Sequence, residues 1–313
     1  MQKDTAPDRI TLVRRAAFIA LFGNLVLAAM KIATGIFANS LAVLGDGIDS
    51  STDVAIALIT LVAGAIMNQP SDRKHPWGHQ RAETIATVIV AFIIMIAGFQ
   101  LVKTSVTQLW NRDFQNQPEP IALIITAISI AGKFLLALSQ SHYGKKANSA
   151  ILRANAKNMV SDIIISASVF VGLGASMLFK LPILDPIIAL LVGLWVMKNA
   201  LGIFMEQNLE LMDGNADDHQ YQILFDAVKS VPGAKNPHRA RIRKMANAWD
   251  IDLDIEVDGN LTVYKAHEIA QAVEAAIRER IPEVYDIMVH VEPAGKGEHG
   301  EQFGIASRNF MVK

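Results

Sequence analysis

The sequence of 313 residues contains no cysteine. This absence excludes disulfide bonds, thiolate nucleophiles and every zinc site that is built on sulfur ligands. An excess of one charge is also missing, because 29 basic residues stand against 30 acidic residues. Nucleic-acid binding usually shows as a basic face or stripe, so the sequence indicates no nucleic-acid partner. No nucleophile–base arrangement indicates an enzyme, and no motif indicates an organic cofactor.

Charged residues are scarce in the first two thirds of the chain. Residues 1–212 carry 30 of the 59 charged side chains, and residues 213–313 carry the other 29. These counts correspond to roughly 14% and 29%, whereas soluble domains average about 25%. The sequence therefore predicts a membrane domain over 1–212 and a soluble domain over 213–293. A tail rich in glycine and charge, 294–313, is expected to be disordered.

Six stretches of the first domain are long and apolar enough to cross a bilayer, which takes about 20 residues. Lys and Arg are enriched in cytoplasmic loops. Ten of them lie in the amino-terminal segment and the second and fourth loops, and two lie in the other loops. We therefore expect both termini in the cytoplasm, with a bacterial inner membrane as the bilayer. The six transmembrane helices are predicted over residues 16–38, 40–67, 83–107, 120–143, 150–179 and 183–206.

The soluble domain alternates between helical and strand-like patterns. The apolar residues of 249–258 alternate as Ile251, Leu253, Ile255 and Val257, which is typical of a strand with one buried face. The order helix, strand, strand, helix, strand predicts a ferredoxin-like α+β fold. Its elements are expected over residues 216–231, 238–245, 249–258, 263–280 and 284–292.

Two pairs of oxygen-bearing side chains lie inside the second and fifth apolar stretches. Asp49 and Asp53 are four residues apart, as are Asn158 and Asp162, so each pair shares one face of a helix. Ionisable residues inside a bilayer are costly and indicate function by default. Two such helices facing one another supply four ligands for a divalent metal ion, with Asp46 supporting them. The alternative is that these side chains form interhelical hydrogen bonds or line a water-filled vestibule.

The second loop contains three further candidate ligands. Asp72, His75 and His79 converge on a metal ion if the intervening Pro76 and Gly78 curl the chain. A zincin-type site is excluded because no glutamate follows His75 and the segment resists a regular helix. The alternative is a pair of solvated histidines.

A series of motifs runs along the chain: Gly45 to Asp53, His75-Pro-Trp-Gly-His79-Gln-Arg-Ala-Glu83, Asn158 with Asp162, Leu184-Asp185-Pro186, Val257-Asp258, Leu261-Thr262-Val263, Ala266-His267-Glu268 and Val289-His290-Val291-Glu292-Pro293. In their order and spacing, these motifs resemble the cation diffusion facilitator family. The resemblance implies a homodimer in a lipid bilayer that exports divalent transition-metal ions from the cytoplasm in exchange for protons. It also implies six membrane helices and a cytoplasmic metal-binding domain.

The family's transport site falls on Asp49, Asp53, Asn158 and Asp162. Zinc-preferring members commonly place histidine at the position of Asn158, so this chain has only oxygen ligands. Oxygen ligands suit harder ions. We therefore expect Mn²⁺ or Fe²⁺ as the transported ion, with Zn²⁺ close behind because zinc also accepts carboxylates.

The resemblance implies two further features. The family's cytoplasmic metal positions fall on Asp254, His267, His290 and Glu292, with Asp252 as an alternative, or these histidines lie at the surface or a dimer interface without metal. The family also pairs a basic and an acidic residue near the membrane surface, which fall on Arg81 and Asp213. The competing function is a membrane sensor that does not transport, and the pairs within the second and fifth stretches favour transport over it.

Overall fold

The computed structural model describes residues 9–67, 69, 71–112, 118–146, 150–214, 218–245, 248–295 and 303–307. The chain divides into two compact units. One comprises Met1–Ala65 and Ala86–Phe204, and the other comprises Ile66–Ile85 and Met205–Lys313. The first unit holds most of the membrane helices. The second holds the soluble domain together with the loop between the second and third helices and the end of the sixth.

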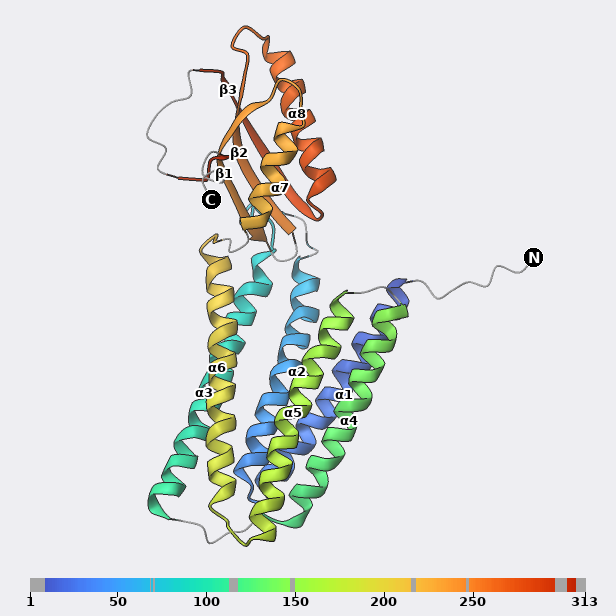
Figure 1. Ribbon diagram of the computed structural model, residues 1–313, viewed down its shortest axis with the longest axis vertical. Coiled ribbons are helices and arrows are strands. Elements are labelled where there is room, and N and C mark those ends of the chain that lie inside the picture. Colours follow the sequence, from blue (N-terminus) through green and yellow to red (C-terminus); the bar gives the residue numbers. More distant parts are fainter. Residues whose placement is uncertain are drawn as a thin grey trace, which may run out of the picture. The chain divides into compact units, whose positions relative to one another are not determined.

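Six long helices confirm the predicted membrane domain. Figure 1 shows them as the long coils α1 to α6, and five are long and apolar enough to cross a membrane. The remaining one, α2, carries Asp46, Asp49 and Asp53 in its first half. Their bounds are α1 Arg9–Phe37, α2 Leu41–Met67, α3 Arg81–Asn111, α4 Pro120–Lys146, α5 Ala150–Leu178 and α6 Leu184–Leu211.

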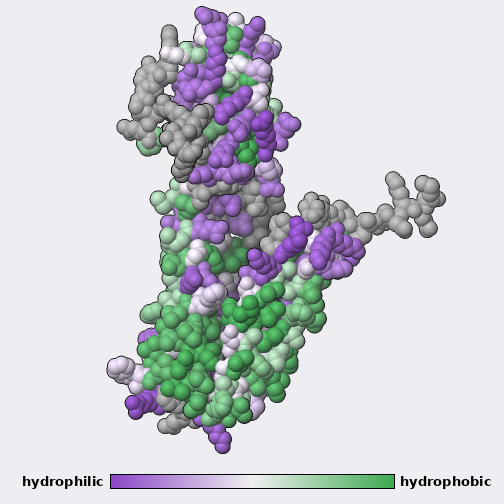
Figure 2. Space-filling model, viewed as in Figure 1, coloured by the Kyte–Doolittle hydropathy of each residue, from purple (hydrophilic) through white to green (hydrophobic). Residues whose placement is uncertain are grey.

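The outside of the helices is apolar. In Figure 2, hydrophobic side chains cover much of the visible surface of this unit. Large residues such as Phe22, Ile93 and Ile164 are more than half exposed, which in a soluble protein would be an aggregation hazard. A lipid environment removes that penalty, so the surface agrees with a membrane location.

The position of α2 is fixed at its start by a buried carboxylate from α6. Asp185 Oδ1 accepts a hydrogen bond from Ser40 Oγ at 2.6 Å, and its Oδ2 accepts one from the backbone N–H of Leu41 at 2.8 Å. Ser40 Oγ in turn accepts from the N–H of Val43, as an N-cap residue does. A negative charge at a helix N-terminus is favoured by the helix dipole. This cap anchors the helix that carries Asp49 and Asp53.

The soluble domain has three strands and two helices in the predicted order. Strand β2 lies between β1, to which it is antiparallel, and β3, to which it is parallel. The helix α8 begins at its predicted residue because Thr262 caps it, its side chain accepting from Lys265 N. The elements are α7 Asp218–Lys229, β1 Lys235–Met245, β2 Ala248–Val257, α8 Val263–Arg280 and β3 Val284–Pro293.

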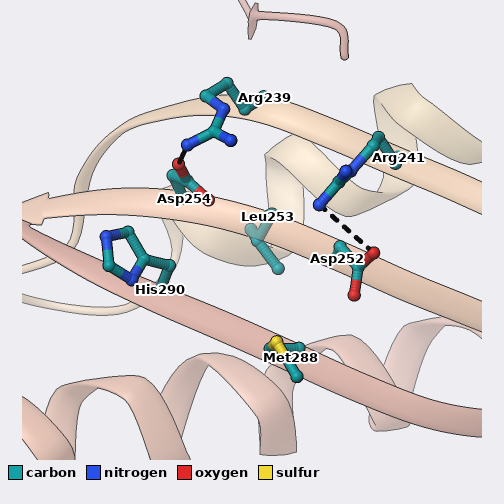
Figure 3. Close-up of a pocket in the computed structure, with 7 residues that line it drawn as sticks. All are labelled: Arg239, Arg241, Asp252, Leu253, Asp254, Met288 and His290. Carbon is teal, nitrogen blue, oxygen red and sulfur yellow. Dashed lines mark hydrogen bonds and ion pairs between the residues drawn. The ribbon is translucent and has the colours of Figure 1, made fainter. Parts of the chain in front are cut away.

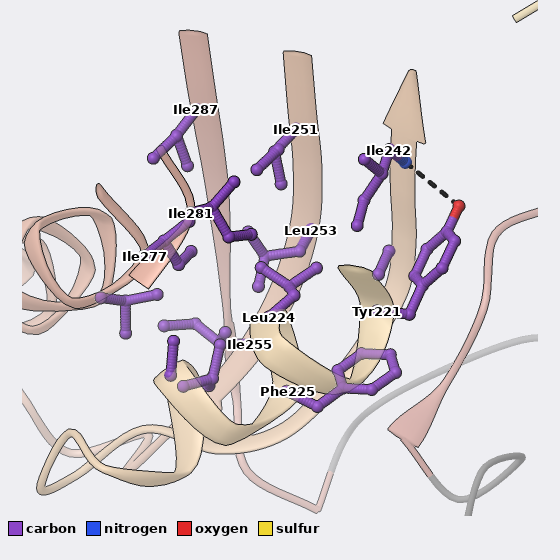
Figure 4. Close-up of a cluster of buried hydrophobic side chains, with 14 of the residues drawn as sticks. Tyr221, Leu224, Phe225, Ile242, Ile251, Leu253, Ile255, Ile277, Ile281 and Ile287 are labelled. Carbon is purple, nitrogen blue, oxygen red and sulfur yellow. Dashed lines mark hydrogen bonds between the residues drawn. The ribbon is translucent and has the colours of Figure 1, made fainter. Parts of the chain in front are cut away.

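The core of this domain lies between the sheet and its two helices. The alternating residues of β2 point to one side, where they meet α7 and α8 (Figure 4). Leu253 is 1% exposed and packs among residues such as Leu224 of α7 and Ile277 of α8. The even-numbered residues of β2 therefore face the opposite side of the sheet. That opposite face carries the acidic side chains of Asp250, Asp252, Asp254 and Glu256.

Two features differ from the predicted division of the chain into a membrane domain, a soluble domain and a disordered tail. The loop after α2 belongs with the soluble unit, because Tyr285 Oη donates to the carbonyl of Trp77 at 3.0 Å. In the tail, Ile305 pairs with Ala240 through two 2.9 Å backbone hydrogen bonds, so residues 303–307 are ordered against β1. This corrects the expected disorder for that segment. The rest of the tail, 296–302 and 308–313, lies outside the described residues.

Candidate metal sites

The structure brings together two of the four predicted transport ligands, one from each helix. Asp53 on α2 and Asp162 on α5 both place Oδ2 at 2.9 Å from the same nitrogen, Nζ of Lys133. The side chains of Asp53 and Asp162 are 25% and 16% exposed. Two carboxylates therefore converge on one cation in a largely buried position.

Lys133 comes from α4 and is itself almost fully buried, with 2% exposure. Its third contact is Oδ1 of Asn24 on α1, which accepts a hydrogen bond at 3.0 Å. A lysine ammonium has three donors and no acceptor, so these three oxygens satisfy it. The point where Asp53 and Asp162 meet is thus shared by four helices.

The other two predicted ligands lie next to this point. Asp49 is one turn from Asp53 on α2 and interacts electrostatically with Asp162, Asp46 and Asp53. Asn158 is exposed to a cavity of about 510 Å³ that Asp53 also lines. The remaining lining residues of this cavity are Ala17, Ala20, Leu21, Asn24, Val54, Ile56, Ala57, Asn155 and Met159.

Asp46, which lies one turn before Asp49 on α2, pairs with a second buried lysine. Nζ of Lys31 lies 2.9 Å from Asp46 Oδ2 and donates to the hydroxyls of Ser50 and Ser166 at 3.0 and 2.8 Å. Ser166 donates to the other oxygen of Asp46 at 2.8 Å. Gly47 permits this close packing of α1 and α2, since a Cβ there would lie 2.9 Å from the backbone nitrogen of Ile32.

Neither lysine was identified by sequence reasoning, although both lie within predicted spans. A charged residue inside an apolar stretch was the available signal. Asp49 with Asp53 and Asn158 with Asp162 were found because each pair has a spacing of four residues. Lys31 and Lys133 are single residues, so no such spacing draws attention to them. The partners of Lys31 and Lys133 depend on which helices are neighbours.

The three predicted ligands of the loop are close together. Their ligand atoms lie within 4.8 Å of one another, and the rings of His75 and His79 are 4.6 Å apart between centroids. Asp72 Oδ1 accepts from the backbone N–H groups of His75 at 2.7 Å and Lys74 at 2.8 Å. The bond from His75 is the main reason that the pKa of Asp72 is lowered. Among the described residues, Nδ1 of His79 is buried without a hydrogen-bond partner, which fits a metal ligand.

Arg81 and Asp213 form the predicted ion pair. Nη2 of Arg81 meets Oδ1 of Asp213, while Nη1 of Arg81 donates to the carbonyl of Glu210 at 2.7 Å. Arg243, which sequence reasoning did not single out, lies 3.7 Å from the other oxygen of Asp213 and 2.5 Å from Asp250. Burial raises the pKa of Asp250, and Arg243 opposes that rise.

The soluble domain gathers a metal-capable group that differs from the prediction. It consists of His238, Asp254 and Glu292, whose ligand atoms lie within 4.8 Å of one another. Nδ1 of His238 lies 2.7 Å from the carbonyl of Asn236, and a carbonyl only accepts, so this nitrogen carries the proton. In the neutral ring Nε2 is then the nitrogen available to a metal ion, and it lies 3.4 Å from Oε2 of Glu292. A hydrogen bond from the other ring nitrogen to a carbonyl commonly fixes the orientation of a histidine that binds a metal ion.

The other two histidines predicted as ligands, His267 and His290, lie outside this group. His267 is an exposed residue of α8, a helix that covers one face of the sheet, whereas Asp254 lies on the other face, so the structure does not bring these two together. His290 lies beside Asp254 in register on β3, at the edge of a pocket (Figure 3). In the same pocket, Arg241 lies 3.4 Å from Asp252, the alternative ligand, and Arg239 lies 2.7 Å from Asp254.

Comparisons with known proteins assign both parts of the chain to one family. Residues 17–212 match the family model of the cation efflux transmembrane domain, and residues 216–294 match that of the cation efflux protein cytoplasmic domain.

Two relatives are similar over most of their length. The manganese efflux system protein MneS of Bacillus subtilis is 30% identical over 91% of this chain and 97% of its own. The cation-efflux pump FieF of Cronobacter sakazakii is 29% identical over 90% and 93%. A solved structure, the metal-bound C-terminal domain of the CzcD transporter from Thermotoga maritima, is 36% identical over 26% of this chain and 93% of that chain, with a TM-score of 0.25. The chain therefore belongs to the cation diffusion facilitator family, as a multi-pass membrane protein for the efflux of divalent metal cations.

Proposed function

We propose that this protein exports Mn²⁺ from the cytoplasm in exchange for protons, through a site formed by Asp49, Asp53, Asn158 and Asp162. The observation that carries the proposal is the convergence of Asp53 and Asp162 on one cation position. The two carboxylates come from helices that are far apart in the sequence, and they meet in an apolar bundle. A protein that only senses metal in its soluble domain has no need of such a position.

The donor set supports manganese as the substrate. All four side chains offer oxygen, and oxygen ligands suit Mn²⁺ better than they suit ions that favour imidazole. The relative MneS is named for manganese efflux. We place Fe²⁺ second and Zn²⁺ close behind, since zinc also binds carboxylates.

Charge counting supports an exchange for protons. Asp49, Asp53 and Asp162 carry three negative charges when ionised, and Lys133 carries one positive charge, which leaves the site with a net charge of −2. One divalent ion neutralises this charge, and so do two protons. A ligand shifts a two-state equilibrium only through its different affinity for the two states. The bound metal ion would stabilise one conformation of the transporter, in which the site opens to one side of the membrane. The bound protons would stabilise the other conformation, in which the site opens to the opposite side.

The cavity beside the site supports access from the cytoplasm. Its lining residues extend from the middle of α1 toward the start of that helix, from the middle of α2 toward its end, and along the first half of α5. In a bundle of alternating helices these parts lie on the side of the amino terminus. We propose that this side is cytoplasmic, as the distribution of Lys and Arg indicates, and that the membrane is a bacterial inner membrane.

Replacing Asn158 with histidine is expected to change the metal preference. The imidazole restores a ligand that zinc favours, so the ratio of Zn²⁺ to Mn²⁺ affinity should rise by about tenfold. Competition among Mn²⁺, Fe²⁺, Zn²⁺, Co²⁺ and Cd²⁺ for the purified protein measures this ratio. Asn155→His, which lines the same cavity one turn earlier, is the matched control. An unchanged ranking in Asn158→His would contradict the role of ligand hardness.

We propose that the soluble domain senses cytoplasmic metal through His238, Asp254 and Glu292 and holds the chain as a homodimer. Metal that binds only the folded state stabilises it by about 2.7 kcal/mol at 100 times its Kd. For a domain of this size, Mn²⁺ or Zn²⁺ should therefore raise the melting temperature by roughly 10 °C over a chelator. His238→Ala should lose this rise, and His267→Ala should keep it. If both variants behave alike, the group is not a metal site.

We propose that the ion pair of Arg81 and Asp213 couples α3 to the end of α6. The pair is partly buried, so each single swap, Arg81→Asp or Asp213→Arg, should reduce the transport rate by about fivefold, equivalent to about 1 kcal/mol. The double swap should recover part of the rate, because Arg243 lies close to position 213 and would repel a new arginine. Additive losses in the double variant would show that the two charges act independently.

A further inference from the structure

Lys133 is a buried lysine whose ammonium lies between the two carboxylates that we assign to transport. Its nitrogen is 2.9 Å from both Asp53 and Asp162 and 3.0 Å from Asn24. All three donors of the ammonium are used, and the three partners lie on α1, α2 and α5. The ammonium is thus held in the manner of a bound cation, by oxygens from three helices other than its own.

We propose that Lys133 is a tethered cation that competes with the transported metal ion for the carboxylates of Asp53 and Asp162. This inference rests on the proposed transport site. A divalent ion held by both carboxylates takes the position between them, and Coulomb repulsion prevents two cations from sharing it. The ion therefore binds only when Lys133 leaves the carboxylates, and Lys133 returns when the ion is released.

The cavity provides space for the displaced ammonium. Lysine carries its charge on a flexible four-carbon stem, so Nζ moves while the backbone of α4 stays in place. Asn24 binds Nζ and also lines the cavity, together with the polar side chains of Asn155 and Asn158. A lysine that leaves Asp53 and Asp162 on this side keeps polar partners.

This competition gives the transporter a physical advantage. Conduction and release require that an ion binds strongly enough to enter and weakly enough to leave. Lys133 lowers the affinity of the site and keeps both carboxylates paired after the ion has departed. Lys31 provides the contrast, because it is equally buried but pairs with Asp46 and two serines, none of which belongs to the proposed ligand set.

The first test measures equilibrium binding of Mn²⁺ to the full-length protein in detergent by titration calorimetry. Lys133→Met is expected to bind Mn²⁺ at least about tenfold more tightly, because a charge-assisted hydrogen bond is worth about that factor. Lys133→Arg keeps the cation and should stay within about threefold of the wild type. The matched control is the double variant Lys31→Met with Asp46→Leu. It removes the other buried lysine together with its partner and should leave the affinity unchanged.

The second test uses the wild-type protein and so does not depend on the folding of a variant. Reductive methylation of lysines, followed by peptide mass spectrometry, reports which amines are accessible. Lys133 should be protected in the presence of a chelator and become reactive with Mn²⁺, whereas Lys31 should be protected in both conditions.

Two outcomes would overturn the inference. In the first, Lys133→Met binds Mn²⁺ no more tightly than the wild type. In the second, Lys133 is equally protected from methylation with and without Mn²⁺. Asp53→Ala separates this failure from that of the proposed site. If Asp53→Ala loses Mn²⁺ binding while Lys133→Met leaves it unchanged, the transport site stands and only the competition is wrong. If Asp53→Ala binds Mn²⁺ normally, the proposed site itself is wrong.

Discussion

Replacing Asp53 or Asp162 with alanine is expected to abolish metal transport, with at least a roughly hundredfold loss of rate. Each carboxylate supplies one of the charges that attract a divalent ion, and hard cations depend on such oxygen ligands. In either variant Lys133 keeps its remaining carboxylate partner, so the balance shifts further against the metal. Flux into proteoliposomes, normalised to the amount of inserted protein, measures the loss.

Asp226→Ala is the control for these variants. Its side chain is 68% exposed on α7 and forms a surface ion pair with Lys229 at 3.5 Å, so transport should be unchanged. Gel filtration in detergent shows whether Asp53→Ala and Asp162→Ala remain folded. Near-normal flux from either of them would remove the proposed transport site.

Replacing Lys31 with methionine is expected to lower the free energy of unfolding by about 3–5 kcal/mol. The substitution leaves the carboxylate of Asp46 buried, with 1% exposure and no opposing charge, and removing one partner of a buried pair has a cost of this size. Adding Asp46→Leu removes the stranded charge and should restore most of the stability. Unfolding in mixed detergent micelles, followed by circular dichroism, measures both variants.

The comparison between the single and the double variant decides the interpretation. If Lys31→Met alone is as stable as the wild type, the pair contributes nothing to the fold. If the double variant is no more stable than the single one, the loss comes from packing between α1 and α2 rather than from the charge of Asp46.

The sequence predicted the helices and strands well because their signals are local. Apolar length predicted the six membrane helices, and the alternation of apolar residues over 249–258 predicted strand β2 of the soluble domain. The pairs Asp49 with Asp53 and Asn158 with Asp162 were found because a helix places residues four apart on one face.

The features that sequence reasoning missed depend on contacts between elements. Lys133 engages Asp53 and Asp162 because α4 packs beside α1 and α5, which no local pattern states. In the soluble domain, His238 lies opposite Asp254 in register, but irregularities in β1 on both sides of His238 break the simple alternation from which its face could have been predicted. His267 was misplaced because the two faces of the sheet were not distinguished.

The most direct test of the account is simultaneous measurement of Mn²⁺ and proton movement in proteoliposomes. With an acidic lumen and Mn²⁺ outside, the wild-type protein should take up Mn²⁺ while the lumen becomes more alkaline. Dissipating the pH gradient should slow the uptake, and Asp53→Ala should show neither movement. Mn²⁺ uptake that is the same with and without the gradient, or proton movement that does not depend on Mn²⁺, would contradict an exchange of metal for protons at this site.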